Sequence, residues 1–158
     1  MVTTLAGTAG RKGSTDGVGA AARFNLPNSI AVDVNGVVYV ADTFNHTIRK
    51  ITPVGSVTTL AGTAGRKGST DGLGTTAFFN SPAGVVVDAQ GMVYVTDHMN
   101  ATVRRITPVG ELTTLADGSR LWSYGRHWAG GSLQKYFRYC GRCPEHLVRN
   151  RWLLPLRH

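Results

Sequence analysis

The chain has 158 residues, of which 42% are hydrophobic and 16% are charged, and its formal net charge is +8. This length and composition predict one globular domain. The sequence contains no apolar run of about 18 residues, which argues against a membrane-spanning helix. The first residues lack the basic head and apolar stretch of a secretory signal, and the localisation stays open.

The positive charge is concentrated at the C-terminal end. Residues 117–158 contain seven arginines and one lysine against Asp117 and Glu145, a net charge of +6 that leaves +2 for the rest of the chain. All three tryptophans and both cysteines also lie in this stretch. The tail therefore differs in composition from the residues before it.

The residues before the tail form a repeat. Residues 2–56 and 57–111 are two copies of one sequence, offset by 55 residues and identical at 36 of those 55 positions. A third copy begins at residues 112–116 and then stops matching. A period of this length predicts a repeat architecture. Because Met1 occupies a position inside the repeat, we expect the sequence to be part of a longer protein.

Each copy predicts four short antiparallel strands. In the first copy these are residues 29–33, 37–42, 47–52 and 57–61. The first strand is a continuous apolar run, as in a strand buried on both faces, whereas the third alternates apolar and polar residues. A four-stranded unit in each repeat is typical of a β-propeller blade. Residues 2–6 repeat the last strand and predict an extra outer strand at the N-terminus.

The residues that flank these strands carry a family resemblance. The pattern F-N-x-P-x-x-[IV]-x-V-D-x-x-G-x-V-Y-V-x-D-x-x-N-x-T-[IV]-R occurs at Phe24–Arg49 and again at Phe79–Arg104, and it resembles the NHL repeat. The resemblance implies that residues 2–116 form an incomplete, all-β propeller with two four-stranded antiparallel blades. Members of this family close rings of about six blades that serve as binding platforms. Two blades are too few for a ring, so further blades or copies of the chain are expected to complete it.

The tail, residues 117–158, shows no repeat and is expected to be irregular. If its coding sequence is read one base later, the codons of Trp122 and Trp128 give glycines with the six-residue spacing of Gly68 and Gly74. Later segments can restore the strands of the repeat in order. This pattern predicts that the tail is a third blade read out of frame.

The tail imitates two kinds of functional site. Cys140 and Cys143 with His146 resemble half of a zinc site or a redox pair, but structural zinc needs four ligands and a redox pair needs a strand-to-helix setting. The arginines and aromatic side chains of the tail resemble a nucleic-acid-binding patch. We predict neither activity for an out-of-frame segment, and we expect no metal and no cofactor.

Polar residues recur at the turns that follow the strands. The aspartate after the first strand of each copy either binds the backbone of its turn or joins a ring of carboxylates near the channel, and the turn is favoured. The D-x-x-N sequence after the second strand favours local bonds to the backbone. The predicted turn residues are Asp33, Asp42 and Asn45 in the first copy and Asp88, Asp97 and Asn100 in the second.

A glycine-rich loop precedes each blade, at residues 7–19 and 62–74. It lacks the strand-to-helix setting of a phosphate-binding loop. We expect it to cross between blades along one rim of the ring, which repeats its basic pair on one surface. The candidate binding residues are Arg11, Lys12 and Asp16 in the first copy and Arg66, Lys67 and Asp71 in the second. The basic residues of the third strand, Arg49, Lys50, Arg104 and Arg105, are expected to be exposed.

These observations favour a non-enzymatic protein-interaction or scaffold module. The rim loops would contact a protein or glycan partner, with no membrane contact. One alternative is a fragment of a propeller enzyme that resembles a lactonase or a peptide-amidating lyase. The repeats disfavour it because no inward histidine recurs: His46, a predicted surface residue, aligns with Ala101. RNA binding by the basic rim is the second alternative, and the net charge of the repeats is small for it.

Overall fold

The computed structural model describes residues 1–117, which belong to one compact unit. The predictions for the out-of-frame blade, the cysteine pair and the arginine-rich patch lie outside the described residues. Within residues 1–117, no helix is long and apolar enough to cross a membrane.

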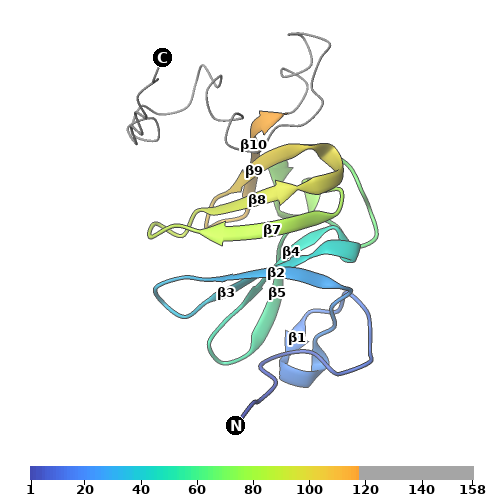
Figure 1. The fold of residues 1–158 in the computed structure, drawn as a ribbon, viewed down its shortest axis with the longest axis vertical. Coiled ribbons are helices and arrows are strands. Elements are labelled where there is room, and N and C mark those ends of the chain that lie inside the picture. The colour runs from blue at the N-terminus through green and yellow to red at the C-terminus, as the bar shows by residue number, and fades with distance from the viewer. Residues whose placement is uncertain (118–158) are drawn as a thin grey trace, which may run out of the picture. The chain divides into compact units, whose positions relative to one another are not determined.

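The two repeats fold into two antiparallel sheets of five strands each (Figure 1). The strand orders are β1-β5-β4-β3-β2 and β6-β10-β9-β8-β7. Four strand connections contain a single 3₁₀ turn. These turns are η1 (Gly19–Ala21) before β2, η2 (Thr43–Asn45) before β4, η3 (Gly74–Thr76) before β7 and η4 (His98–Asn100) before β9. The first sheet contains β1 (Gly17–Val18), β2 (Pro27–Val32), β3 (Val38–Asp42), β4 (Thr47–Ile51) and β5 (Ser56–Ala61). The second contains β6 (Gly72–Leu73), β7 (Pro82–Val87), β8 (Val93–Asp97), β9 (Thr102–Ile106) and β10 (Glu111–Asp117).

The four long strands of each sheet are those that the sequence predicts, and the all-β, propeller-type fold is confirmed. β3 is rich in β-branched and aromatic residues, which suit a strand inside a sheet. It pairs with β4 in continuous register from Val38 opposite Ile51 to Asp42 opposite Thr47. His46, in the left-handed conformation with φ 58°, ends η2 and starts the return strand.

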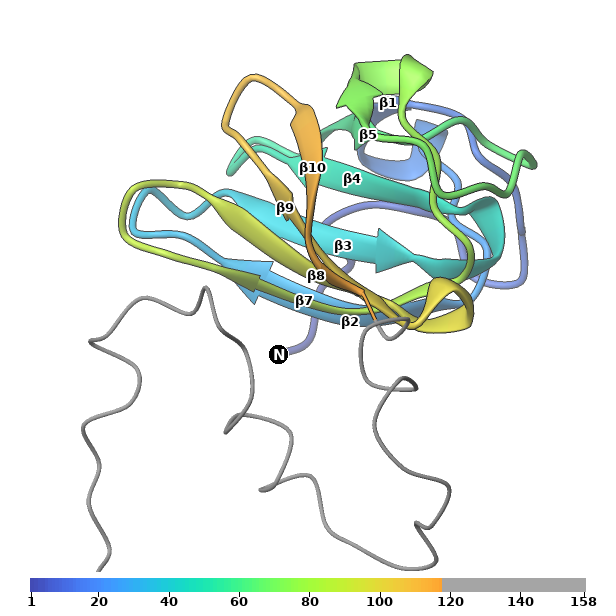
Figure 2. The ribbon, with the colours of Figure 1, turned by 90° about the horizontal axis from the view of Figure 1, so that it is seen from above.

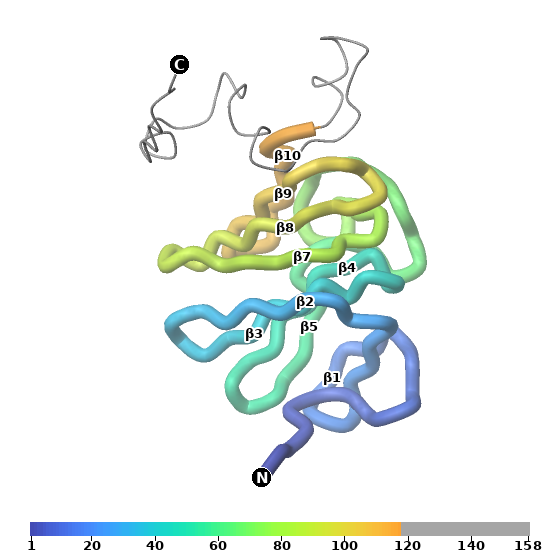
Figure 3. Tube along the Cα trace, in the orientation of Figure 1, coloured from blue at the N-terminus to red at the C-terminus, as the bar shows by residue number. Residues whose placement is uncertain are grey.

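A fifth, two-residue strand in each sheet comes from the glycine-rich loop. Gly17 and Val18 of β1 pair with Val57 and Ser56 of β5, on the outer edge of the sheet. The loop therefore folds back on its own blade before it reaches β2, as the tube in Figure 3 traces. A pair of residues is too short to give a periodic pattern, which is why the sequence predicts a plain crossing here.

The predicted N-terminal strand is wrong. Residues 2–6 form no strand within the described part of the chain. The equivalent residues of the next copy form β5, which is a strand because it pairs with β4. No counterpart of β4 precedes residue 2 in this sequence, so the segment has no neighbour to pair with.

The core lies between the two sheets. β2 and β7, which are edge strands of the first and the second sheet, lie side by side (Figure 2). The remaining strands of both sheets lie on the same side of this pair. Ile48 of the first sheet, Val93 and Val95 of the second, and Phe79 from the segment before β7 are almost fully buried in one apolar cluster. Burial of such side chains is the main stabilising contribution to the pair of blades.

Candidate functional site

A buried arginine lies at the centre of each blade. Arg49 extends from β4 with a side chain that is 1% exposed, although the alternating pattern of that strand predicts a solvent-exposed side chain. Arg104 occupies the same place on β9 and is fully buried. The prediction of exposure is therefore wrong for both arginines. The glycine-rich loop covers this face of the sheet and supplies partners for the guanidinium group.

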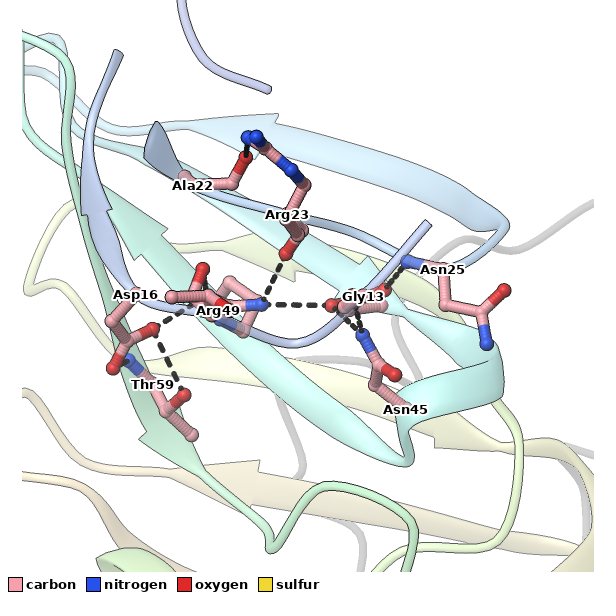
Figure 4. A network of polar contacts seen from close by, with 10 residues as sticks. Gly13, Asp16, Ala22, Arg23, Asn25, Asn45, Arg49 and Thr59 are labelled. Atoms are coloured by element: carbon pink, nitrogen blue, oxygen red, sulfur yellow. Dashed lines mark hydrogen bonds and ion pairs between the residues drawn. The ribbon is translucent and has the colours of Figure 1, made fainter. Parts of the chain in front are cut away.

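Arg49 is held by two carboxylates and the loop backbone (Figure 4). Its Nη1 donates to Oδ2 of Asp42 at 2.9 Å and its Nη2 donates to Oδ1 of Asp16 at 2.5 Å. The two amino groups also donate to the carbonyl oxygens of Arg23 and Thr15. A buried charge requires such pairing, because an unpaired ion in the interior is strongly destabilising.

The D-x-x-N sequence belongs to the same network. Asp42 is fully buried, and its Oδ2 also accepts a hydrogen bond of 2.7 Å from Nδ2 of Asn45. The amide of Asn45 donates in addition to the carbonyl oxygen of Gly13 in the loop, at 2.7 Å. Asp42 and Asn45 therefore connect their turn to the loop and to Arg49, and not to local backbone alone.

The second blade repeats these contacts. Arg104 binds Asp97 at 2.9 Å and Asp71 at 2.7 Å, and Asn100 donates to Asp97 and to the carbonyl oxygen of Gly68. Burial acts to raise the pKa of Asp71, but hydrogen bonds from Thr114 and Arg104 outweigh it and hold the pKa below its ordinary value. The structure thus places Asp16 and Asp71, predicted as binding residues, in contact with buried arginines.

The aspartates after the inner strands lie in turns. Oδ1 of Asp33 accepts hydrogen bonds from the backbone of Asn35 and Val37, at 2.8 and 3.0 Å. Burial first, and then the charge of Asp33, raises the pKa of Tyr39, whose hydroxyl donates to that carboxylate. Asp88 makes the same contacts in the second blade, with Gln90, Met92 and Tyr94.

Polar side chains of the first blade join the two blades at the inner strands. Asn28 donates to the carbonyl oxygen of Ala83, and Ser29 accepts from the backbone of Val85. Thr43 donates to the carbonyl oxygen of Pro82 at 2.7 Å. These side chains satisfy backbone groups of β7 that face the first blade.

His46 adds a fourth polar contact at this junction. Its Nδ1 accepts a hydrogen bond from the backbone of Ser81 at 3.0 Å, so the imidazole carries no proton on that atom. Burial lowers the pKa of His46, the charge of Lys67 lowers it further, and Asp97 acts in the opposite direction. The sequence predicts only a surface histidine at this position. It could not reveal the contact with Ser81, because the two residues lie 35 positions apart and leave no local pattern.

A groove opens above the junction, where the blades meet at one rim. It is shallow and open to solvent, with a volume of about 620 Å³. Three apolar side chains on its walls are mostly exposed: Leu26 (50%), Phe44 (59%) and Met99 (63%). We call it the rim groove, and its lining residues are Leu26, Pro27, Asn28, Thr43, Phe44, Ser81, Ala83, His98 and Met99.

The basic pair of the second loop, Arg66 and Lys67, lies near the rim groove. The amide of Gly65 donates to the carbonyl oxygen of Asn45, which brings the loop of the second copy to η2 beside the groove. Lys67 is exposed, and its positive charge lowers the pKa of His46. Ser81, the hydrogen-bond partner of His46, lines the groove. Arg66 lies over the ring of Phe78, 5.0 Å from its centre.

The first pair differs from the second in its surroundings. Arg11 and Lys12 are exposed, and Arg23 stands at the position of Phe78, so the first loop offers no aromatic ring at this position. Among residues 1–117, no three acidic, histidine or cysteine side chains gather to hold a metal ion.

A sequence model of the NHL repeat matches residues 24–51 and 79–106. Over 95 residues, the chain is 38% identical to Protein SUPPRESSOR OF QUENCHING 1, chloroplastic, of Arabidopsis thaliana. It is 35% identical over 95 residues to NHL repeat-containing protein 2 of Homo sapiens. The matches cover 60% and 58% of this chain but 9% and 13% of those proteins, so the chain spans a small part of their length.

Solved structures with similar blades include two proteins of Bacteroides thetaiotaomicron. A structural genomics protein of unknown function has a TM-score of 0.60 and 30% identity, with 63% of this chain and 26% of that chain covered. An auxiliary nutrient binding protein has a TM-score of 0.57 and 29% identity, with 71% and 28% covered. Both comparisons agree with the propeller-type fold of the repeats.

Proposed function

Because the chain carries two NHL repeats that fold as propeller blades, we propose that it is a non-enzymatic interaction module. Its rim groove and the adjacent basic pair bind a segment of a protein partner. The observation that carries the proposal is the joint exposure of Phe44, Met99 and Lys67 on one rim. Apolar anchors beside positive charge suit a segment that alternates apolar and acidic residues.

The roles of the repeated carboxylates support a binding function over catalysis. Asp42 and Asp16 pair with Arg49, and Asp33 holds a turn. A general acid or base needs a carboxylate that can reach a substrate, and these groups are bound to structural partners. The similarity to an auxiliary nutrient binding protein at 29% identity also supports a binding role for blades of this kind.

Two substitutions on the groove and one on the basic pair test the proposal. The probe is a set of labelled peptides that alternate leucine with glutamate, compared with peptides in which glutamine replaces glutamate. We expect binding of the acidic set to weaken in Phe44→Ser, Met99→Ser and Lys67→Glu. Val54→Ser is the matched control, since Val54 is 82% exposed in the turn between β4 and β5.

The outcomes separate the alternatives. Equal binding of acidic and neutral peptides by the unmodified chain, or equal loss in Val54→Ser, would contradict the proposal. Preference for poly-uridylate RNA, with a steep loss of affinity as salt rises, would favour the nucleic-acid alternative. Preference for a sulfated oligosaccharide would favour a glycan partner.

A further inference from the structure

Each position of the repeat occurs once in the first blade and once in the second, in two different environments. Comparing the exposure of equivalent residues identifies two complementary surfaces. Ile30 of β2 and Val85 of β7 occupy the same position of the repeat. Val85 is 4% exposed because it packs against the first sheet, whereas Ile30 is 65% exposed. Val32 is 56% exposed, and its equivalent Val87 packs against the core. We call the face of the first sheet that carries Ile30, Val32 and Val38 the trailing face.

The opposite face of the second sheet gives the reverse comparison. Ile48 of β4 is fully buried at the junction, but its equivalent Val103 is 40% exposed. Leu60 packs against the core, while its equivalent Leu115 is 47% exposed. Val86 is 61% exposed at the position of Ala31, which packs against the core. We call the face that carries Val86, Val103 and Leu115 the leading face.

The blade junction inside the chain joins one leading face to one trailing face. At this junction, Ala31 and Ile48 of the first sheet pack in one apolar cluster with Val85 and Val93 of the second sheet. The leading face of the second sheet and the trailing face of the first therefore repeat both halves of an interface that the chain already forms. We propose that copies of this chain associate head to tail, leading face against trailing face.

Such an interface is heterologous, so the assembly closes when the rotation between blades completes a turn. Propellers contain about four to eight blades. A chain with two blades then closes as a ring of two, three or four copies. The total side-chain volume at these positions is similar on the two leading faces. Val86 is larger than its equivalent Ala31, and Val103 is smaller than its equivalent Ile48.

The junction between copies is expected to be weaker than the junction inside the chain. Asn28, Ser29 and Thr43 donate or accept across the internal junction. Their equivalents on the leading face of the second blade are Ala83, Gly84 and His98. Ala and Gly offer no side-chain hydrogen bond, and Ala101 replaces His46. Association therefore depends on chain concentration, while the two blades of one chain stay together.

Arginine substitutions on each face of the full chain test the proposal. Sedimentation velocity over a range of concentrations should give a mass of two, three or four chains of 16.9 kDa each. Ile30→Arg on the trailing face and Val86→Arg on the leading face should each give monomers. Val54→Arg and Val109→Arg are the controls, because both valines lie in outer turns and are 82% and 79% exposed.

Mixing the two face variants decides the geometry. Each variant keeps one intact face, so an equal mixture of Ile30→Arg and Val86→Arg should form one dimer with one copy of each and grow no further. This dimer also shows that both variants fold. A monomeric unmodified chain, association of either variant alone, or dissociation of the Val54→Arg control would overturn the proposal.

Discussion

Two arginines that look like surface residues form buried ion pairs at the centre of their blades. Arg49 is the partner of Asp42, and both side chains are almost fully buried. Replacement of Arg49 by methionine keeps an unbranched apolar side chain but removes the guanidinium group, which leaves the buried carboxylate of Asp42 without its cation. We expect a loss of about 3–5 kcal/mol in the free energy of unfolding, measured by urea denaturation.

A second substitution isolates the charge. In the double variant Arg49→Met, Asp42→Asn, the buried group is neutral, and we expect part of the lost stability to return. The control is Lys50→Met, at the adjacent half-buried position of β4. A loss below about 1 kcal/mol in Arg49→Met would contradict a structural ion pair.

The contact of His46 with Ser81 predicts a dependence of stability on pH. Burial and Lys67 hold the pKa of His46 below its ordinary value of about 6.5. The unfolded chain therefore takes up a proton first as the pH falls. The contribution of His46 is complete above about pH 6.5 and declines as the pH falls from there toward the lower pKa of the folded state.

The variant His46→Ala introduces the residue that the second copy has at this position, Ala101. Urea denaturation of both proteins at several pH values gives the difference in their free energies of unfolding. This difference should be largest at neutral pH and should narrow in acid. A constant difference would show that protonation of His46 does not affect the junction.

At the scale of the element, the four long strands of each blade follow from the sequence, because local side-chain patterns specify them. The burial of Arg49 could not be predicted from the local pattern, because it depends on Asp16, which lies 33 residues earlier in the chain. One signal was available: Arg49 and Arg104 are identical in the two copies, while the adjacent Lys50 becomes Arg105. The rim groove could not be predicted, because it forms where two repeats meet.

The loop that enters the second blade passes very close to the first. A Cβ atom on Gly62 would lie 2.5 Å from the carbonyl oxygen of His46, whereas one on Gly7 would meet only the ring of Phe24 at 3.4 Å. Both glycines have φ +96°, so the backbone strain of alanine is the same at the two positions. Gly62 and Gly7 are therefore a matched pair for the steric contact at the blade junction.

We expect Gly62→Ala to lower the free energy of unfolding by about 1–3 kcal/mol more than Gly7→Ala does. The shared part, from the left-handed backbone, is about 1–2 kcal/mol in each variant. Thermal or urea unfolding of the two variants gives the comparison. Equal losses would mean that the carbonyl oxygen of His46 does not occupy the space that a Cβ atom at position 62 needs.

For the whole molecule, head-to-tail association predicts that stability rises with chain concentration. A partner that binds the folded state adds stability by mass action. When most chains are associated, a tenfold increase in concentration should add about 1 kcal/mol to the free energy of unfolding, which corresponds to a few degrees in Tm. Differential scanning calorimetry at several concentrations measures this shift.

The face variants provide the control for this prediction. Val86→Arg removes the leading face, so its Tm should be the same at every concentration and should match that of the unmodified chain at high dilution. Val54→Arg should keep the full dependence, because its turn lies outside both faces. A concentration dependence that survives in Val86→Arg would mean that copies meet through another surface. A Tm of the unmodified chain that is independent of concentration would mean that the two exposed faces do not pair.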